Sequence, residues 1–88
     1  MLVNDKECEA AGISAAEVGR VALAFDKAAK RARALGLFVF GGSGGGTLRF
    51  RDDPTRGALI VARLDEVQLY DGGDGGEMED ADGLERGE

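Results

Sequence analysis

The sequence predicts an α+β fold: one amphipathic helix packed on a three- to four-stranded antiparallel meander, followed by a disordered acidic C-terminal tail. Three observations lead to this prediction. Apolar residues recur at helical spacing over residues 14–35, β-favouring runs and turn residues alternate over 37–70, and glycine and acidic residues dominate 71–88. We therefore divide the chain into an N-terminal arm or short helix (1–13), a helix-plus-sheet domain (14–70) and a disordered Gly/acidic tail (71–88).

The N-terminal residues admit two interpretations. The run Asp5–Ala11 forms either a short helix closed by Gly12 or a loose arm. A loose arm could also fold back over an open face of the sheet and close the domain as a monomer.

The strongest local signal is a helix start at Ser14. Ser14 as N-cap, with Glu17 three residues later, forms a capping box, and Ile13 with Val18 supplies a hydrophobic staple. Gly36 favours the left-handed cap that ends a helix, so we expect the helix to occupy 14–35. Its apolar face comprises Val18, Val21, Ala22, Phe25, Ala28, Ala29, Ala32 and Leu35.

Three β-favouring runs follow the helix. Residues 37–40 and 47–51 predict a hairpin, with the glycine-rich run 41–46 at its tip. Turn residues at 52–57 separate this hairpin from a third strand at 58–64. The run Val67–Tyr70 extends the third strand past a bulge or forms a short fourth strand.

Residue counts exclude most catalytic sites. The sequence has no histidine, and Cys8 is its only cysteine. Zinc, Cys/His and Ser/His sites and an internal disulfide are therefore excluded, and we expect no enzyme activity, no cofactor and no metal. No secretory segment opens the chain, and no apolar run approaches the roughly 20 residues that span a bilayer, so a cytoplasmic location is expected.

Charge is distributed unevenly along the chain. The net charge is −6, yet residues 71–88 carry eight acids against Arg86 alone, while residues 14–64 carry nine bases against four acids. On the helix, Arg20, Lys27 and Arg31 are spaced seven and four residues apart and form a stripe opposite the apolar face. This stripe is either a solvated outer face or a contact for an acidic partner.

The predicted strands are more apolar than one helix can cover. The uncovered sheet face would expose large apolar residues beside basic ones, drawn from Phe38, Phe40, Leu59, Val61, Arg49, Arg51 and Arg63. An exposed apolar patch marks an interaction surface, and pairing of like faces in a homodimer would cover it. The sequence leaves the strand register open, and we expect no interleaving of aromatic and basic residues of the RNA-binding type.

These features favour a non-enzymatic macromolecular interaction module, with a protein as the first-choice partner and nucleic acid as a secondary one. In size and chemistry, though in no residue motif, the chain resembles the small accessory proteins of phages and prophages that inhibit a host complex, anti-CRISPR proteins among them. That resemblance implies inhibition by binding. Two alternatives stay open: a nucleic-acid-binding domain with an autoinhibitory acidic tail, and a small structural or assembly protein of a virion.

Overall fold

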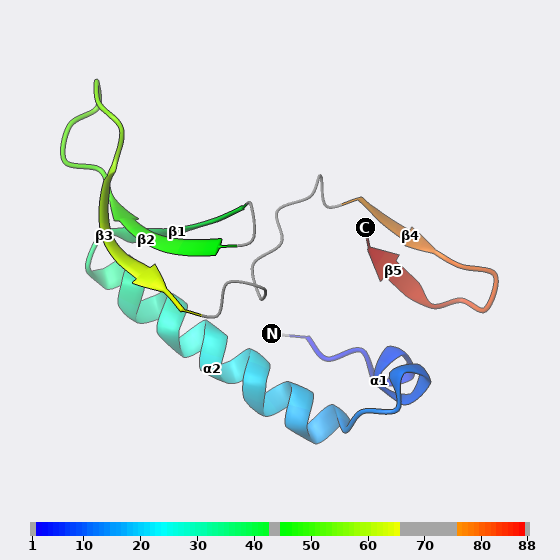
Figure 1. The fold of residues 1–88 in the computed structure, drawn as a ribbon. Coiled ribbons are helices and arrows are strands. Elements are labelled where there is room, and N and C mark those ends of the chain that lie inside the picture. Colours follow the sequence, from blue (N-terminus) through cyan, green and yellow to red (C-terminus); the bar gives the residue numbers. More distant parts are fainter. Residues whose placement is uncertain (1, 43–44, 66–75, 88) are drawn as a thin grey trace. The chain divides into compact units, whose positions relative to one another are not determined.

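The predicted α+β class is confirmed by the computed structural model, which describes residues 2–42, 45–65 and 76–87 (Figure 1). The described residues contain two helices, a three-stranded antiparallel sheet and a separate two-stranded hairpin. The chain divides into two compact units. The first comprises residues 1–30 and 75–88, and the second comprises residues 31–74.

The N-terminal segment forms the short helix that was one of its two predicted states. Helix α1 (Asp5–Ala11) ends at Gly12, whose φ of 72° is left-handed. The amide of Gly12 donates to the Glu9 carbonyl, and the amide of Ile13 donates to the Cys8 carbonyl, both at 3.1 Å. These bonds satisfy carbonyls at the end of the helix that have no partner within it.

The long helix α2 (Ala15–Ala34) begins where the sequence predicted. The Ser14 hydroxyl accepts a hydrogen bond from the Glu17 amide at 3.2 Å, so Ser14 is the N-cap. The Glu17 carboxylate pairs with Arg20 on the helix surface. Beyond the helix end, Gly36 has the left-handed φ of 77° expected of a C-terminal cap.

The sheet is the predicted meander. Strands β1 (Leu37–Gly42), β2 (Gly45–Phe50) and β3 (Leu59–Leu64) are antiparallel and lie in the order β1-β2-β3 (Figure 1). Between β2 and β3, an Asx turn holds the connection, because the Asp53 carboxylate accepts hydrogen bonds from the amide and the hydroxyl of Thr55. The predicted strand extension at Val67–Tyr70 lies outside the described residues.

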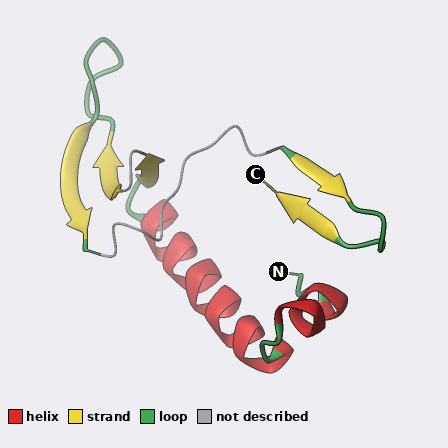
Figure 2. Cartoon of the chain, turned by 45° about the vertical axis from the view of Figure 1, so that its right-hand side comes forward, coloured by secondary structure: helices red, strands yellow, loops and turns green. Residues whose placement is uncertain are grey.

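The acidic tail differs from its prediction. Residues 71–75 lie outside the described part of the chain, but β4 (Glu77–Glu79) and β5 (Glu85–Gly87) form an antiparallel hairpin, so the predicted disorder is wrong for this stretch (Figure 2). Its loop is closed by one carboxylate. Oδ1 of Asp80 accepts from the amides of Asp82 at 2.9 Å and Leu84 at 3.1 Å, and the Asp80 amide donates to the Leu84 carbonyl.

The hairpin also contacts α1 within the first unit. The Glu85 amide donates to Oε2 of Glu7 at 3.0 Å, and Nδ2 of Asn4 donates to Oε2 of Glu85 at 2.8 Å. Polar contacts of this kind supply order where almost no apolar surface is available, and composition alone does not reveal them.

Candidate binding face of the sheet

The strand register sorts the sheet side chains into two faces of different chemistry. Residues that pair directly across antiparallel strands project to the same side. Phe38 pairs with Arg49, and Phe40 pairs with Thr47. On the other side of β2, Thr47 pairs with Arg63 and Arg49 with Ile60. We call this side the arginine face, and it comprises Phe38, Phe40, Thr47, Arg49, Ile60 and Arg63, with Arg51 following at the end of β2.

A β-bulge at Val61 sets this composition. Leu48 pairs with Ala62 while the next residue, Arg49, pairs with Ile60, which leaves Val61 as the extra residue of β3. Ile60 and Ala62 therefore lie on opposite faces although they are two residues apart. Without the bulge, the period-two alternation would place Ile60 on the same side as Ala62 and move it off the arginine face.

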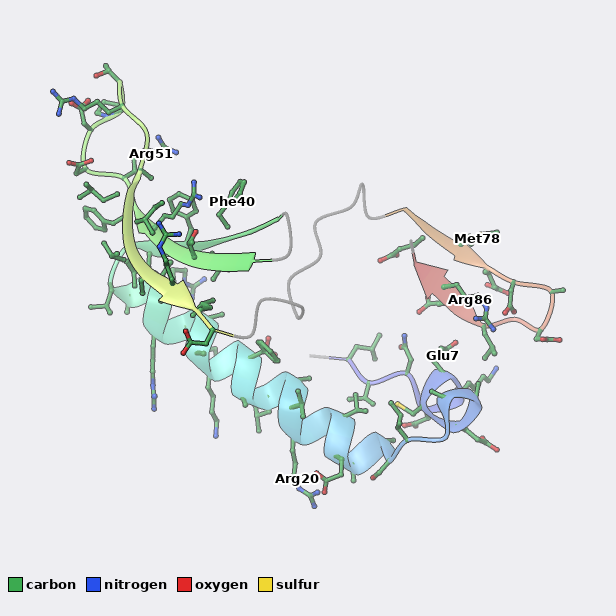
Figure 3. The ribbon with its side chains drawn as sticks, in the orientation of Figure 1. Glu7, Arg20, Phe40, Arg51, Met78 and Arg86 are labelled. Atoms are coloured by element: carbon green, nitrogen blue, oxygen red, sulfur yellow. The ribbon has the colours of Figure 1, made fainter. Side chains whose placement is uncertain are left out.

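Two arginines stack on the two phenylalanines of the arginine face. The Arg49 guanidinium carbon lies 4.3 Å from the centroid of the Phe40 ring, and that of Arg51 lies 5.9 Å from the Phe38 ring. Figure 3 shows Phe40 and Arg51 among the side chains of the sheet. Both distances fall within the roughly 6 Å range of cation–π attraction.

Hydrogen bonds fix the positions of these arginines further. Nε of Arg49 donates to the Thr47 hydroxyl at 2.8 Å, and Nη1 of Arg51 donates to the Arg56 carbonyl at 3.3 Å. A guanidinium held in this way loses less freedom when it binds a ligand, which favours affinity. Sequence reasoning did not select Thr47 or Ile60, because their place on this face depends on the register.

The charge of the arginine face is not neutralised within the described residues. In residues 2–42, 45–65 and 76–87, Arg49, Arg51 and Arg63 form no ion pair with a carboxylate. The nearby acid Asp53 faces its own turn and lies 3.7 Å from Arg56. Hydrogen bonds from the amide and the hydroxyl of Thr55 hold the pKa of Asp53 below its usual value, so it stays ionised in that turn.

The opposite side, which we call the apolar face, carries no charged residue in the described strands. It comprises Leu37, Val39, Leu48, Phe50, Leu59, Ala62 and Leu64. Val39 and Leu59 are each 50% exposed, whereas Phe50 lies against the backbone of Gly36, where an added Cβ would come within 3.0 Å of the ring. Leu59 was one of four apolar candidates for a place beside the arginines, and the register places it on the other face, across from Phe50.

The predicted site residues therefore separate into four groups. Phe38, Phe40, Arg49, Arg51 and Arg63 come together on the arginine face, whereas Leu59 belongs to the apolar face and Val61 to the bulge. The basic stripe lies on α2, with Arg20 bonded to Glu17 and both Lys27 and Arg31 exposed. Arg20 and Lys27 fall in the first unit and Arg31 in the second.

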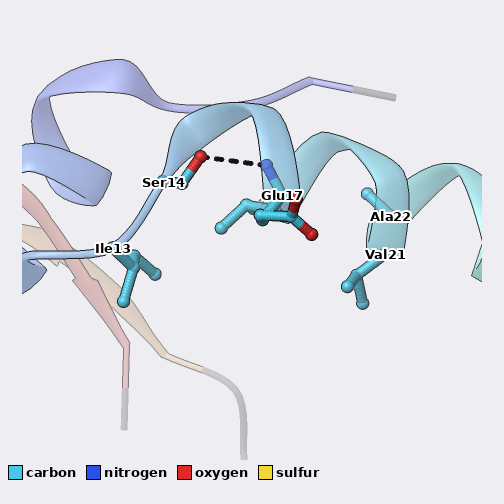
Figure 4. A pocket seen from close by; sticks show the side chains of 6 residues that line it. Ile13, Ser14, Glu17, Val21 and Ala22 are labelled. Carbon is cyan, nitrogen blue, oxygen red and sulfur yellow. Dashed lines mark hydrogen bonds between the residues drawn. The ribbon is translucent and has the colours of Figure 1, made fainter.

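A shallow apolar hollow lies at the start of α2 (Figure 4). It has a volume of about 540 Å³ and is lined by Ile13, Ser14, Glu17, Val18, Val21 and Ala22. The polar groups at its rim already have partners within the helix, since the Ser14 hydroxyl accepts from the Glu17 amide and the Glu17 carboxylate pairs with Arg20. The hollow thus offers apolar contact without a group that could orient a small ligand.

No helix in the described residues combines the length and the apolar character needed to cross a membrane. Within the same residues, no group of three or more acidic or cysteine side chains is arranged to hold a metal ion. Comparisons with protein-family models, with curated proteins and with solved structures gave no match.

Proposed function

We propose that this chain is a non-enzymatic interaction module that binds an anionic macromolecule through the arginine face. The observation that supports the proposal is the grouping of three arginines, none of them paired with an acid of the described residues, beside two half-exposed phenylalanines. Aromatic side chains, phenylalanine included, and arginine are enriched at protein interfaces relative to the rest of the surface.

The charge of the segment that carries the sheet agrees with an anionic partner, although Glu66, Asp71 and Asp74 bring the whole second unit to a net charge of zero. Residues 31–65 contain six arginines and three aspartates, a net charge of +3, in a chain whose net charge is −6. A local positive field draws anionic partners to this surface and raises the rate of encounter. An inhibitor of the phage accessory type, acting in the cytoplasm, would use the same surface to occupy an acidic site on a host complex.

Retention on a heparin column tests this proposal. We expect the full chain to be retained at low salt, and the double variant Arg49→Gln/Arg63→Gln to elute at clearly lower salt, because polyanion affinity depends on the number of cations at the contact. Arg56→Gln is the matched control, since Arg56 lies in the β2–β3 connection and faces Asp53. Equal elution of the double variant and the wild-type chain would refute the assignment of this face.

Self-association is a second candidate function, and the apolar face favours it. That face gathers exposed apolar side chains with no charged residue among them, so two copies could pair without bringing arginines together. Light scattering at micromolar concentration should give about twice the chain mass, and Val39→Thr should shift the balance toward the monomer. A monomer mass for the wild-type chain would overturn the homodimer.

A further inference from the structure

We propose that the macromolecule bound by the arginine face is a single-stranded nucleic acid, with arginines on its phosphates and the phenylalanine rings against its bases. This inference rests on the proposed function and narrows its partner. The residues assigned to the site are Phe38, Phe40, Arg49, Arg51 and Arg63.

The register interleaves aromatic and basic groups on the arginine face, contrary to the expectation from the sequence, and this alternation favours a nucleic acid over an acidic protein. Across β1 and β2 the order along the face is Phe40 with Arg49, followed by Phe38 with Arg51. Successive same-face residues of a strand are spaced by about 6.8 Å, so charge and ring recur at regular intervals. Sites for single strands combine a positive track for the backbone with aromatic groups for the bases. An acidic protein segment offers carboxylates but no repeated flat surface for the rings.

The exposure of the two rings supports base stacking. Phe38 is 38% exposed and Phe40 is 53% exposed, although each also lies next to a guanidinium. Guanidinium planes and phenyl rings both stack on nucleobases, so a base can take the place of the arginine on the ring while the arginine turns to a phosphate. The bases of a duplex are already stacked on one another, so this chemistry selects a single strand.

Fluorescence anisotropy with the full chain tests the inference. The probe is a labelled oligo(dT) of about 15 nucleotides, a length that spans the site sizes of small single-strand-binding domains. We expect saturable binding. The logarithm of the binding constant should fall with the logarithm of the salt concentration with a slope of about −2, the value for three phosphate contacts on a single strand. A duplex of the same length and poly-glutamate, used as competitors, should displace the probe poorly.

Variants separate stacking from charge. Phe38→Leu/Phe40→Leu keeps the strands apolar but removes the rings, and should weaken oligo(dT) binding by at least about fivefold without changing heparin retention. Phe50→Leu is the matched control, because Phe50 lies on the apolar face. Arg63→Gln should lower the salt slope by about 0.7. Far-UV circular dichroism of each variant checks that the sheet is intact.

The outcomes distinguish this inference from the proposed function. Heparin retention without oligo(dT) binding, or displacement of the probe by poly-glutamate as readily as by unlabelled oligo(dT), would overturn the nucleic-acid partner and leave the anion-binding face standing. Equal competition by the duplex, or unchanged affinity of the double phenylalanine variant, would overturn recognition of a single strand by stacking. If the wild-type chain binds neither heparin nor oligo(dT), both proposals are overturned.

Discussion

The β1–β2 and β4–β5 hairpins of this chain are held together by different interactions. In β1–β2, large apolar and aromatic residues pair across the strands, as Leu37 does with Phe50 and Val39 with Leu48. In β4–β5, the paired residues are mostly charged, and Glu79 faces Glu85 directly. The first hairpin is therefore stabilised by side chains along its strands, and the second by the hydrogen bonds of its loop and by its contacts to α1.

This difference shows that amino-acid composition alone does not decide whether a segment is ordered. Acid- and glycine-rich segments lack the apolar surface that offsets the entropy of ordering. A single aspartate can still close a loop when its carboxylate accepts hydrogen bonds from backbone amides of that loop. Asp80 does so for the amides of Asp82 and Leu84. Arg86 then pairs with Asp80 across the hairpin.

The largest expected effect concerns the backbone turn before β1. Gly36→Ala should lower the free energy of unfolding by roughly 2 kcal/mol, because it places a Cβ in the left-handed region and within 3.0 Å of the Phe50 ring. Gly12→Ala is the matched control: Gly12 has a similar φ of 72°, but an added Cβ there has no atom within 4 Å. Chemical denaturation of both variants measures the difference, and equal losses would remove the ring contact from the explanation.

Removing the cap of α2 should have the next largest effect. Ser14→Ala loses the hydroxyl that accepts the Glu17 amide, and we expect a loss of about 1 kcal/mol in the free energy of unfolding. Ser14→Asp is the control, since an aspartate accepts the same amide and also favours the positive end of the helix dipole. An unchanged melting midpoint for the alanine variant would contradict the cap at this position.

A more local effect is expected in the acidic hairpin. Asp80→Ala should abolish the hydrogen-exchange protection of the Leu84 amide while leaving the amides of β2 protected, because only the hairpin loop depends on this carboxylate. Asp82→Ala, in the same loop and with the same change of charge, should retain most of that protection. Retained protection at Leu84 in the Asp80 variant would mean that strand pairing alone holds β4–β5.

Acid should reproduce the Asp80 effect without a mutation. The hydrogen bond from Arg86, followed by the amide of Leu84, holds the pKa of Asp80 below its ordinary value. A carboxylate whose pKa is lower in the folded state stabilises that state above its unfolded pKa of about 3.9, and the contribution disappears as the pH falls through the lowered value. The amide chemical shift of Leu84 should therefore change below about pH 4, and Asp80→Asn should remove most of this change.

Local signals in the sequence were sufficient to locate most elements. The cap at Ser14 and the glycine at position 36 place the ends of α2 within one residue of the predicted helix. Apolar runs separated by glycine and turn residues place β1, β2 and β3. Each of these signals acts over three to eight neighbouring residues, so the chain itself brings the interacting groups together.

The composition of the two sheet faces could not be predicted in this way. The sequence alone determined that Phe38, Phe40, Arg49, Arg51 and Arg63 belong to strands or their ends. Only the tertiary structure decided that they share a face, because strand pairing joins residues far apart in the chain and the bulge at Val61 shifts the alternation of β3 by one residue. The hairpin at 77–87 also depends on tertiary structure, because the contacts from Asn4 and Glu7 to Glu85 join residues from nearly opposite ends of the chain.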